Sequence, residues 1–92
     1  MRFLYFYLMT GDQVAIREIA RDHAHYWHSL NLPDYEGGPV ADRTGSLIIF
    51  NADSEQQAQS LASADPFRSA GVIERFWLKQ WIPETASKED LA

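Results

Sequence analysis

The sequence predicts an α+β domain of the ferredoxin-like order β-α-β-β-α-β, with a four-stranded antiparallel sheet and two helices on one face. Three observations support this fold. Short segments dense in aromatic and branched residues are typical of strands. Two segments between them have apolar residues at helical spacing and begin near residues that cap helices. A chain of 92 residues has room for a single domain.

The first strand and the first helix are the clearest elements. Phe3–Met9 is apolar, and it ends at Thr10-Gly11-Asp12. A helix is expected over Gln13–Leu30, capped by Thr10 or Asp12. His23 falls on its apolar face, so this side chain is expected to point toward the sheet. The other members of this face are Ile16, Ile19, Ala20, Trp27 and Leu30.

The rest of the chain continues the alternation of strand and helix. A weak second strand is expected near Tyr35–Val40, and Ala41–Gly45 turns the chain into a third strand over Ser46–Asn51. Ser54 followed by Gln57 resembles a capping box, and this helix is expected to run to about Ala64. The fourth strand is expected over Val72–Ile82, which is rich in branched and aromatic residues.

The strands also predict a homodimer. Two helices cover one face of such a sheet, and a solvated second face would make apolar and polar residues alternate. Phe3–Leu8 and Leu47–Phe50 are instead apolar at successive positions. A second copy of the same sheet is the simplest cover for that face.

Composition narrows the possible functions. The chain has no cysteine, which excludes disulfides and thiolate chemistry, and its net charge of −5 argues against a nucleic-acid groove. Met1–Met9 lacks the features of a signal peptide, and no apolar run is long enough to cross a membrane. A cytoplasmic protein is therefore expected. No cofactor is expected, and Gly37-Gly38-Pro39 lacks the pattern and the lysine of a phosphate loop.

His23 and Asp65 each have a structural and a functional interpretation. A histidine on an apolar helix face is often a core residue, but an imidazole beside a carboxylate is also the usual general base. Asp65 precedes Pro66 and would make a good helix cap. A carboxylate has enough acceptor sites to cap a helix and to face His23 as well. His25 and His28 have no evident third ligand, so no metal site is expected.

The segment Asp65-Pro66-Phe67-Arg68-Ser69-Ala70-Gly71-Val72 links these residues to a known family. Taken with His23, Gly38-Pro39 and the strand start Gly45-Ser46, it resembles the YciI-like (YCII-related) family of small dimeric α+β barrel proteins. The resemblance covers roughly residues 1–82. The remaining residues, 83–92, are expected to form an extended or disordered tail.

The resemblance implies a site and an activity. His23 and Asp65 would form an acid–base pair in a cofactor-independent enzyme. Its reaction would be an elimination, such as dehydrochlorination, or an isomerisation of a small cyclic or phenolic substrate. The alternative is a non-catalytic dimeric module that binds a metabolite, with His23 sealed in the core. The residues expected to contact the ligand are Gly38, Pro39, Ser46, Phe67 and Arg68, although Arg68 is also typical of a solvated surface.

Overall fold

The computed structural model describes residues 1–84, and it has the predicted order of elements. The strands are β1 (Arg2–Met9), β2 (Glu36–Pro39), β3 (Gly45–Asn51) and β4 (Ile73–Gln80), and the helices are α1 (Gln13–Ser29), α2 (Glu55–Ser63) and the short α3 (Pro66–Ser69). The predicted bounds are therefore close to the observed ones. The tail expected over 83–92 falls almost wholly on residues 85–92, which lie outside the described residues.

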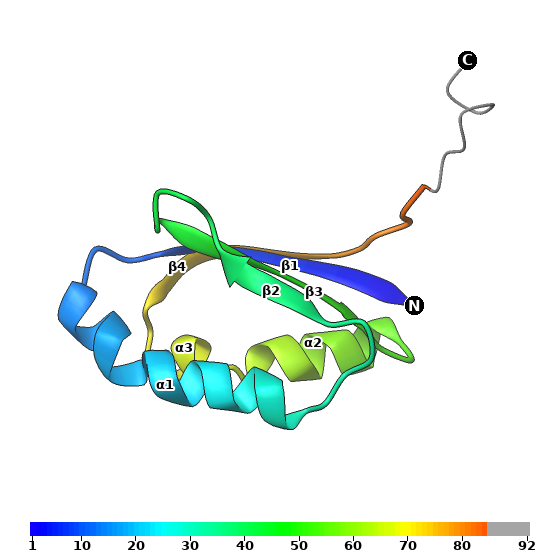
Figure 1. Ribbon diagram of the computed structural model, residues 1–92, viewed down its shortest axis with the longest axis horizontal. Helices are drawn as coiled ribbons and strands as arrows, with labels where there is room; N and C mark the ends of the chain where they lie inside the picture. The colour runs from blue at the N-terminus through cyan, green and yellow to red at the C-terminus, as the bar shows by residue number, and fades with distance from the viewer. Residues whose placement is uncertain (85–92) are drawn as a thin grey trace, which may run out of the picture.

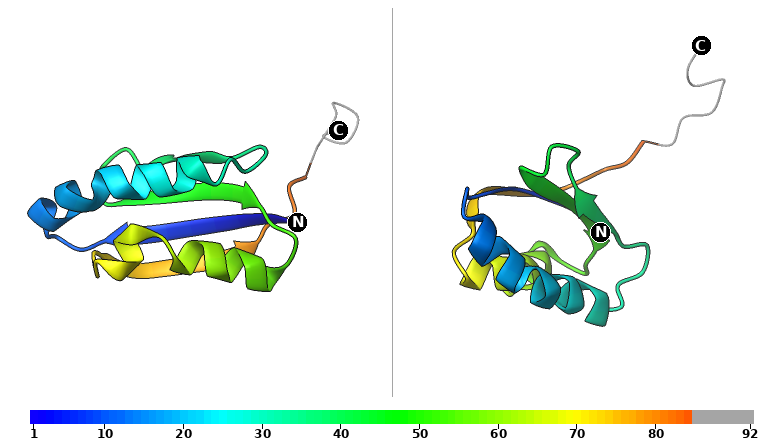
Figure 2. Two further views of the ribbon diagram at one scale, coloured as in Figure 1. Left: turned by 90° about the horizontal axis from the view of Figure 1, so that it is seen from below. Right: turned by 60° about the vertical axis from the view of Figure 1, so that its left-hand side comes forward.

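The four strands form one antiparallel sheet in the order β2-β3-β1-β4, which is the ferredoxin-like arrangement. All of the helices lie on one face of it (Figure 1). Seen from that side, α1 runs along the half of the sheet that contains β3, while α2 and α3 lie along the half that contains β4 (Figure 2). The helices therefore meet over the middle of the sheet, where β1 runs.

The alternation of side chains along β1 separates the two faces. Phe3, Tyr5 and Tyr7 are buried beneath the helices, and the residues between them point to the opposite face. Tyr7 lies opposite Ser46 in β3, so two hydroxyl-bearing residues share one row beneath the helices. The face of the sheet that packs against the helices thus carries the hydroxyl groups of Tyr7 and Ser46 as well as the apolar core.

The helix termini explain where the helices begin and end. The Asp12 carboxylate accepts a hydrogen bond from the Ala15 amide at 3.1 Å, so Asp12, rather than Thr10, caps α1. Asn31 has a φ of 49°, a conformation that asparagine tolerates and that commonly follows a helix. Ser54 caps α2 through the Gln57 amide at 3.0 Å, as the sequence predicted.

The opposite face of the sheet is apolar over its central strands. Leu4 and Phe6 of β1 pair with Ile49 and Leu47 of β3, and none of these four side chains is fully buried. Phe6 also stacks on Trp77 of β4 with ring centroids 5.7 Å apart, and Trp77 is 36% exposed. None of the described helices covers this surface (Figure 1).

Gly45 permits the close approach of β3 to β1. A Cβ atom at this position would collide with the backbone carbonyl oxygen of Tyr7. We expect Gly45→Ala to lower the free energy of unfolding by about 1–3 kcal/mol in urea denaturation, since the strands must separate to admit a methyl group. Gly38→Ala is the matched control, because a Cβ there meets no atom within 4 Å. Equal stability of the two variants would contradict this packing.

Candidate active site

The site is built around the Asp65 carboxylate, which is fully buried. Its Oδ1 atom accepts a hydrogen bond from the Phe67 amide at 2.8 Å, which caps α3. Its Oδ2 atom accepts from the Trp27 indole at 2.8 Å, and the His23 Nδ1 atom lies 2.8 and 2.9 Å from the two oxygens. One carboxylate therefore caps α3 and contacts His23 as well.

These contacts define the hydrogen-bonding state of His23. The indole and the backbone amide can only donate, and an ionised carboxylate accepts at each of its contacts. His23 Nδ1 then carries the proton that faces Asp65, and a neutral imidazole keeps its free lone pair on Nε2. The ring is held further by stacking on Phe67, with centroids 4.1 Å apart and planes inclined by 15°.

Tyr7 lies at the free side of the imidazole. Its hydroxyl is 3.3 Å from His23 Nε2, and its ring meets the His23 ring edge to face. Burial raises the pKa of Tyr7 above its ordinary value, with a smaller opposing effect from the Ser46 hydroxyl. Tyr7 is therefore a neutral phenol over the physiological range, and it can donate to the Nε2 lone pair.

A cavity of about 520 Å³ opens beside these groups. It lies between α1 and the β2–β3 hairpin, and its wall contains both His23 and Tyr7. The His23 side chain is 17% exposed, so it is not sealed in the core. A volume in this range suits a small organic ligand.

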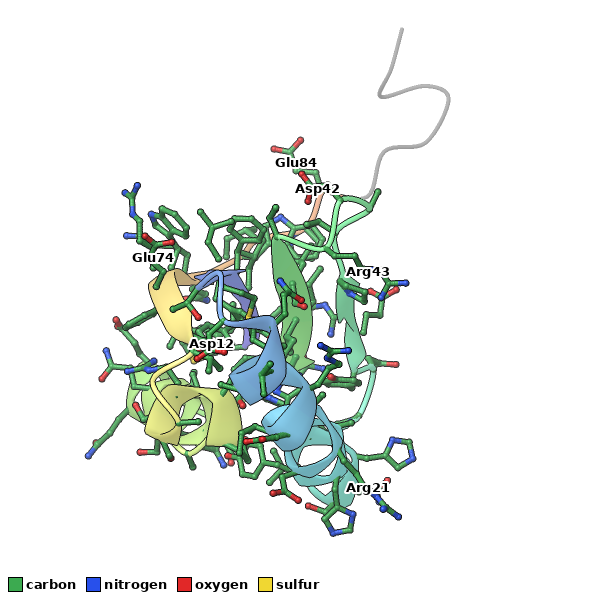
Figure 3. The ribbon with its side chains drawn as sticks, turned by 90° about the vertical axis from the view of Figure 1, so that its left-hand side faces the viewer. Asp12, Arg21, Asp42, Arg43, Glu74 and Glu84 are labelled. Atoms are coloured by element: carbon green, nitrogen blue, oxygen red, sulfur yellow. The ribbon has the colours of Figure 1, made fainter. Side chains whose placement is uncertain are left out.

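Most of the predicted ligand contacts lie in the wall of this cavity. Gly38 and Pro39 come from β2, Ser46 from β3 and Phe67 from α3. Arg68 is not in the wall: its guanidinium lies over the Phe76 ring, 3.8 Å from the centroid. Arg43, on the β2–β3 hairpin, does contribute to the wall, whereas Arg21 of α1 points away from the sheet (Figure 3).

Two residues of the site were not predicted as such. Trp27 was placed with the core, although it is four residues from His23 on the same helix face, a spacing that brings side chains together. Tyr7 lies within Phe3–Leu8, which the sequence indicates only as part of an apolar strand. No local pattern links Tyr7 to His23, since their contact depends on how α1 crosses β1.

Comparison with known proteins assigns the chain to a family. The sequence profile of the YCII-related domain matches residues 5–82. The chain belongs to this family. The resemblance noted from the sequence motifs is therefore confirmed. A comparison with curated protein sequences found no match.

Solved structures extend the comparison. The 5-chloro-2-hydroxyhydroquinone dehydrochlorinase TftG from Burkholderia phenoliruptrix AC1100, in complex with 2,5-dihydroxybenzoquinone, has a TM-score of 0.76 and 26% identity, covering 89% of this chain and 94% of TftG. Two others share the fold alone. Rv0793 from Mycobacterium tuberculosis has a TM-score of 0.52 and 9% identity, covering 92% and 97% of the two chains. Atu4242 from Agrobacterium tumefaciens has a TM-score of 0.53 and 17% identity, covering 96% and 98%.

Two further features concern residues 1–84. Within this part of the chain, no group of three or more His, Cys, Asp or Glu side chains is arranged to hold a metal ion. None of the helices described is long and apolar enough to span a membrane.

The donors around Asp65 lead to a prediction about stability. Asparagine caps a helix as well as aspartate does. Its amide NH₂ would, however, take the place of the second carboxylate oxygen and face a donor from which that oxygen now accepts a hydrogen bond. We expect Asp65→Asn to lower the free energy of unfolding by about 1–3 kcal/mol in urea denaturation. Asp22→Asn on the exposed side of α1 is the control, with an expected change within about 0.5 kcal/mol. An Asp65→Asn variant as stable as the wild type would show that the buried contacts do not require a carboxylate.

Proposed function

We propose that this protein is a cofactor-independent enzyme that moves protons on a small ring compound bearing acidic hydroxyl groups. One observation supports this most strongly. A buried carboxylate holds His23 through Nδ1, and the His23 side chain forms part of the wall of a cavity of ligand size. A purely structural histidine would be sealed, and His23 is not. TftG, a dehydrochlorinase of similar fold at 26% identity, supports elimination as the reaction.

His23 is the general base in this proposal, and Asp65 is its positioning residue. The Nε2 lone pair takes a proton from a substrate hydroxyl, so that an O–H bond breaks and an N–H bond forms. The Asp65 carboxylate stabilises the resulting imidazolium through Nδ1–H. A phenolic proton suits this base because the phenolate spreads its charge over the ring.

The atoms balance for loss of HCl from a chlorinated hydroxyhydroquinone. A proton taken from one hydroxyl is delivered to the ring carbon that carries chlorine, which becomes tetrahedral. Loss of a second hydroxyl proton then breaks the C–Cl bond and releases chloride. The product is a hydroxyquinone, and no oxidant is required. His23 acts in turn as base and acid in this sequence.

The cavity wall supplies the remaining roles. Phe67 contributes an aromatic ring to the cavity wall, and Gly38 and Pro39 also line the cavity. The Ser46 hydroxyl, in the same row as Tyr7 and in the cavity wall, would hydrogen-bond a substrate oxygen. Arg68 lies on Phe76, away from the cavity, and has no role in this scheme.

A substitution at His23 tests the proposal. His23→Asn keeps an amide N–H to satisfy Asp65 but removes the base. With 5-chloro-2-hydroxyhydroquinone as substrate, we expect the rate of chloride release to fall by at least about 100-fold, a typical contribution of general base catalysis. His25→Asn, on the exposed side of α1, should match the wild type.

Two outcomes would contradict the proposal. Unchanged turnover by His23→Asn would exclude His23 as the base. Binding of 2,5-dihydroxybenzoquinone by the wild type, with no turnover of chlorinated hydroxyhydroquinones, would instead favour the non-catalytic binding module.

We also propose that two copies pair through the open face of the sheet, as the strand pattern predicts. Leu4, Phe6, Leu47, Ile49 and Trp77 form a continuous apolar surface there. Burying such a surface is favourable at about 25 cal/mol per Å² of apolar area. Pairing of this kind would form the dimeric α+β barrel implied by the family.

Phe6→Glu tests this pairing, because a carboxylate in the centre of the interface would be buried without a partner. We expect a dimer for the wild type and a monomer for Phe6→Glu in analytical ultracentrifugation. Val14→Glu, at an exposed apolar position on α1, should remain dimeric. A monomeric wild type would contradict the proposal.

A further inference from the structure

We propose that the Tyr7 hydroxyl is a catalytic hydrogen-bond donor, which holds the lone pair of His23 in the resting enzyme and transfers its hydrogen bond to the substrate oxyanion. This inference rests on the function proposed above. It assigns a role to a residue that neither the sequence motifs nor the comparisons single out.

The position of Tyr7 is fixed by the fold. It is fully buried near the end of β1, between Ser46 of β3 and Phe76 of β4. Its ring also packs against Phe67, with centroids 6.3 Å apart. These neighbours hold the phenol so that its oxygen lies in the cavity wall, 3.3 Å from His23 Nε2.

The protonation state makes this oxygen a donor rather than a second base. Burial raises the pKa of Tyr7, so its hydroxyl keeps its proton where His23 functions. Because Nδ1–H faces Asp65, the Nε2 atom of neutral His23 can only accept. The Tyr7 hydroxyl is thus the donor in the resting contact, and it orients the lone pair that must receive the substrate proton.

Substrate binding changes the partner of this donor. The Tyr7 O–H turns from Nε2 to the substrate oxygen, and the vacated Nε2 lone pair then accepts the substrate proton. The substrate oxygen gains negative charge in this step, within reach of both groups. The Tyr7 O–H bond stays intact, and its hydrogen bond to that oxygen strengthens as the charge develops. Such a donor acts more strongly in the transition state than in the ground state, which raises kcat.

Tyr5 provides a matched control on the same strand and face. Its phenol is also fully buried, but its hydroxyl has no hydrogen-bond partner among residues 1–84 and is not part of the cavity wall. Tyr5→Phe and Tyr7→Phe therefore remove the same atom from neighbouring positions of the core. Only Tyr7→Phe removes a contact with His23.

The experiment measures turnover and ligand binding for wild type, Tyr5→Phe and Tyr7→Phe. Turnover is followed with 5-chloro-2-hydroxyhydroquinone, and we expect Tyr7→Phe to lower kcat by about 100-fold, as for loss of one oxyanion donor, with little change in KM. Binding is followed with 2,5-dihydroxybenzoquinone, a vinylogous acid ionised at neutral pH. Its Kd should rise about 10-fold or more in Tyr7→Phe, because a hydrogen bond to a charged oxygen is lost. Tyr5→Phe should match the wild type in both.

The outcomes separate this inference from the function on which it rests. If the wild type is active and His23→Asn is not, but Tyr7→Phe has normal kcat and Kd, the role of Tyr7 is wrong and the general base stands. A Tyr5→Phe variant impaired as much as Tyr7→Phe would also overturn the inference, since the effect would belong to the core. A wild type that neither binds nor turns over these compounds overturns both proposals.

Discussion

The buried Asp65 carboxylate is the interaction on which the site depends. A charged group without solvent contact is costly unless donors surround it, and here a backbone amide, an indole and an imidazole do so. These donors come from α3 and α1, which are far apart in the sequence. One carboxylate thus connects the two helical segments and fixes the His23 ring between them.

The orientation of His23 has consequences for its chemistry. The same contact that satisfies Asp65 favours a proton on Nδ1, and the other nitrogen, Nε2, lies 3.3 Å from the Tyr7 hydroxyl in the cavity wall. In the proposed mechanism, stability and reactivity would therefore depend on the same atoms. The side chains of β1 alternate between the two faces of the sheet. One face carries Tyr7 and the candidate site, and the other carries the apolar surface proposed for pairing.

Much of the fold follows from local sequence signals. The apolar segments, the Ser54 cap and the wheel position of His23 predict the strands, the second helix and the direction of that histidine. The pairing of His23 with Asp65 came from the family motif, because residues 42 positions apart carry no spacing rule. The roles of Trp27 and Tyr7 required the structure, since an indole or a phenol in a core has the same sequence pattern whether or not it meets a polar partner. Arg68 shows the converse, because its place in the motif does not bring it to the cavity.

The central claim is that Nε2 is the unprotonated nitrogen of His23 and that it accepts a proton from a ligand in the cavity. Long-range ¹H–¹⁵N NMR of the histidine rings measures this directly, with and without 2,5-dihydroxybenzoquinone. The account predicts a protonated Nδ1 and an unprotonated Nε2 for His23 in the free protein at neutral pH, with the Nε2 signal shifting when the ligand binds. A proton on Nε2 with an unprotonated Nδ1, or His23 ring signals that do not change when the ligand binds, would contradict the account.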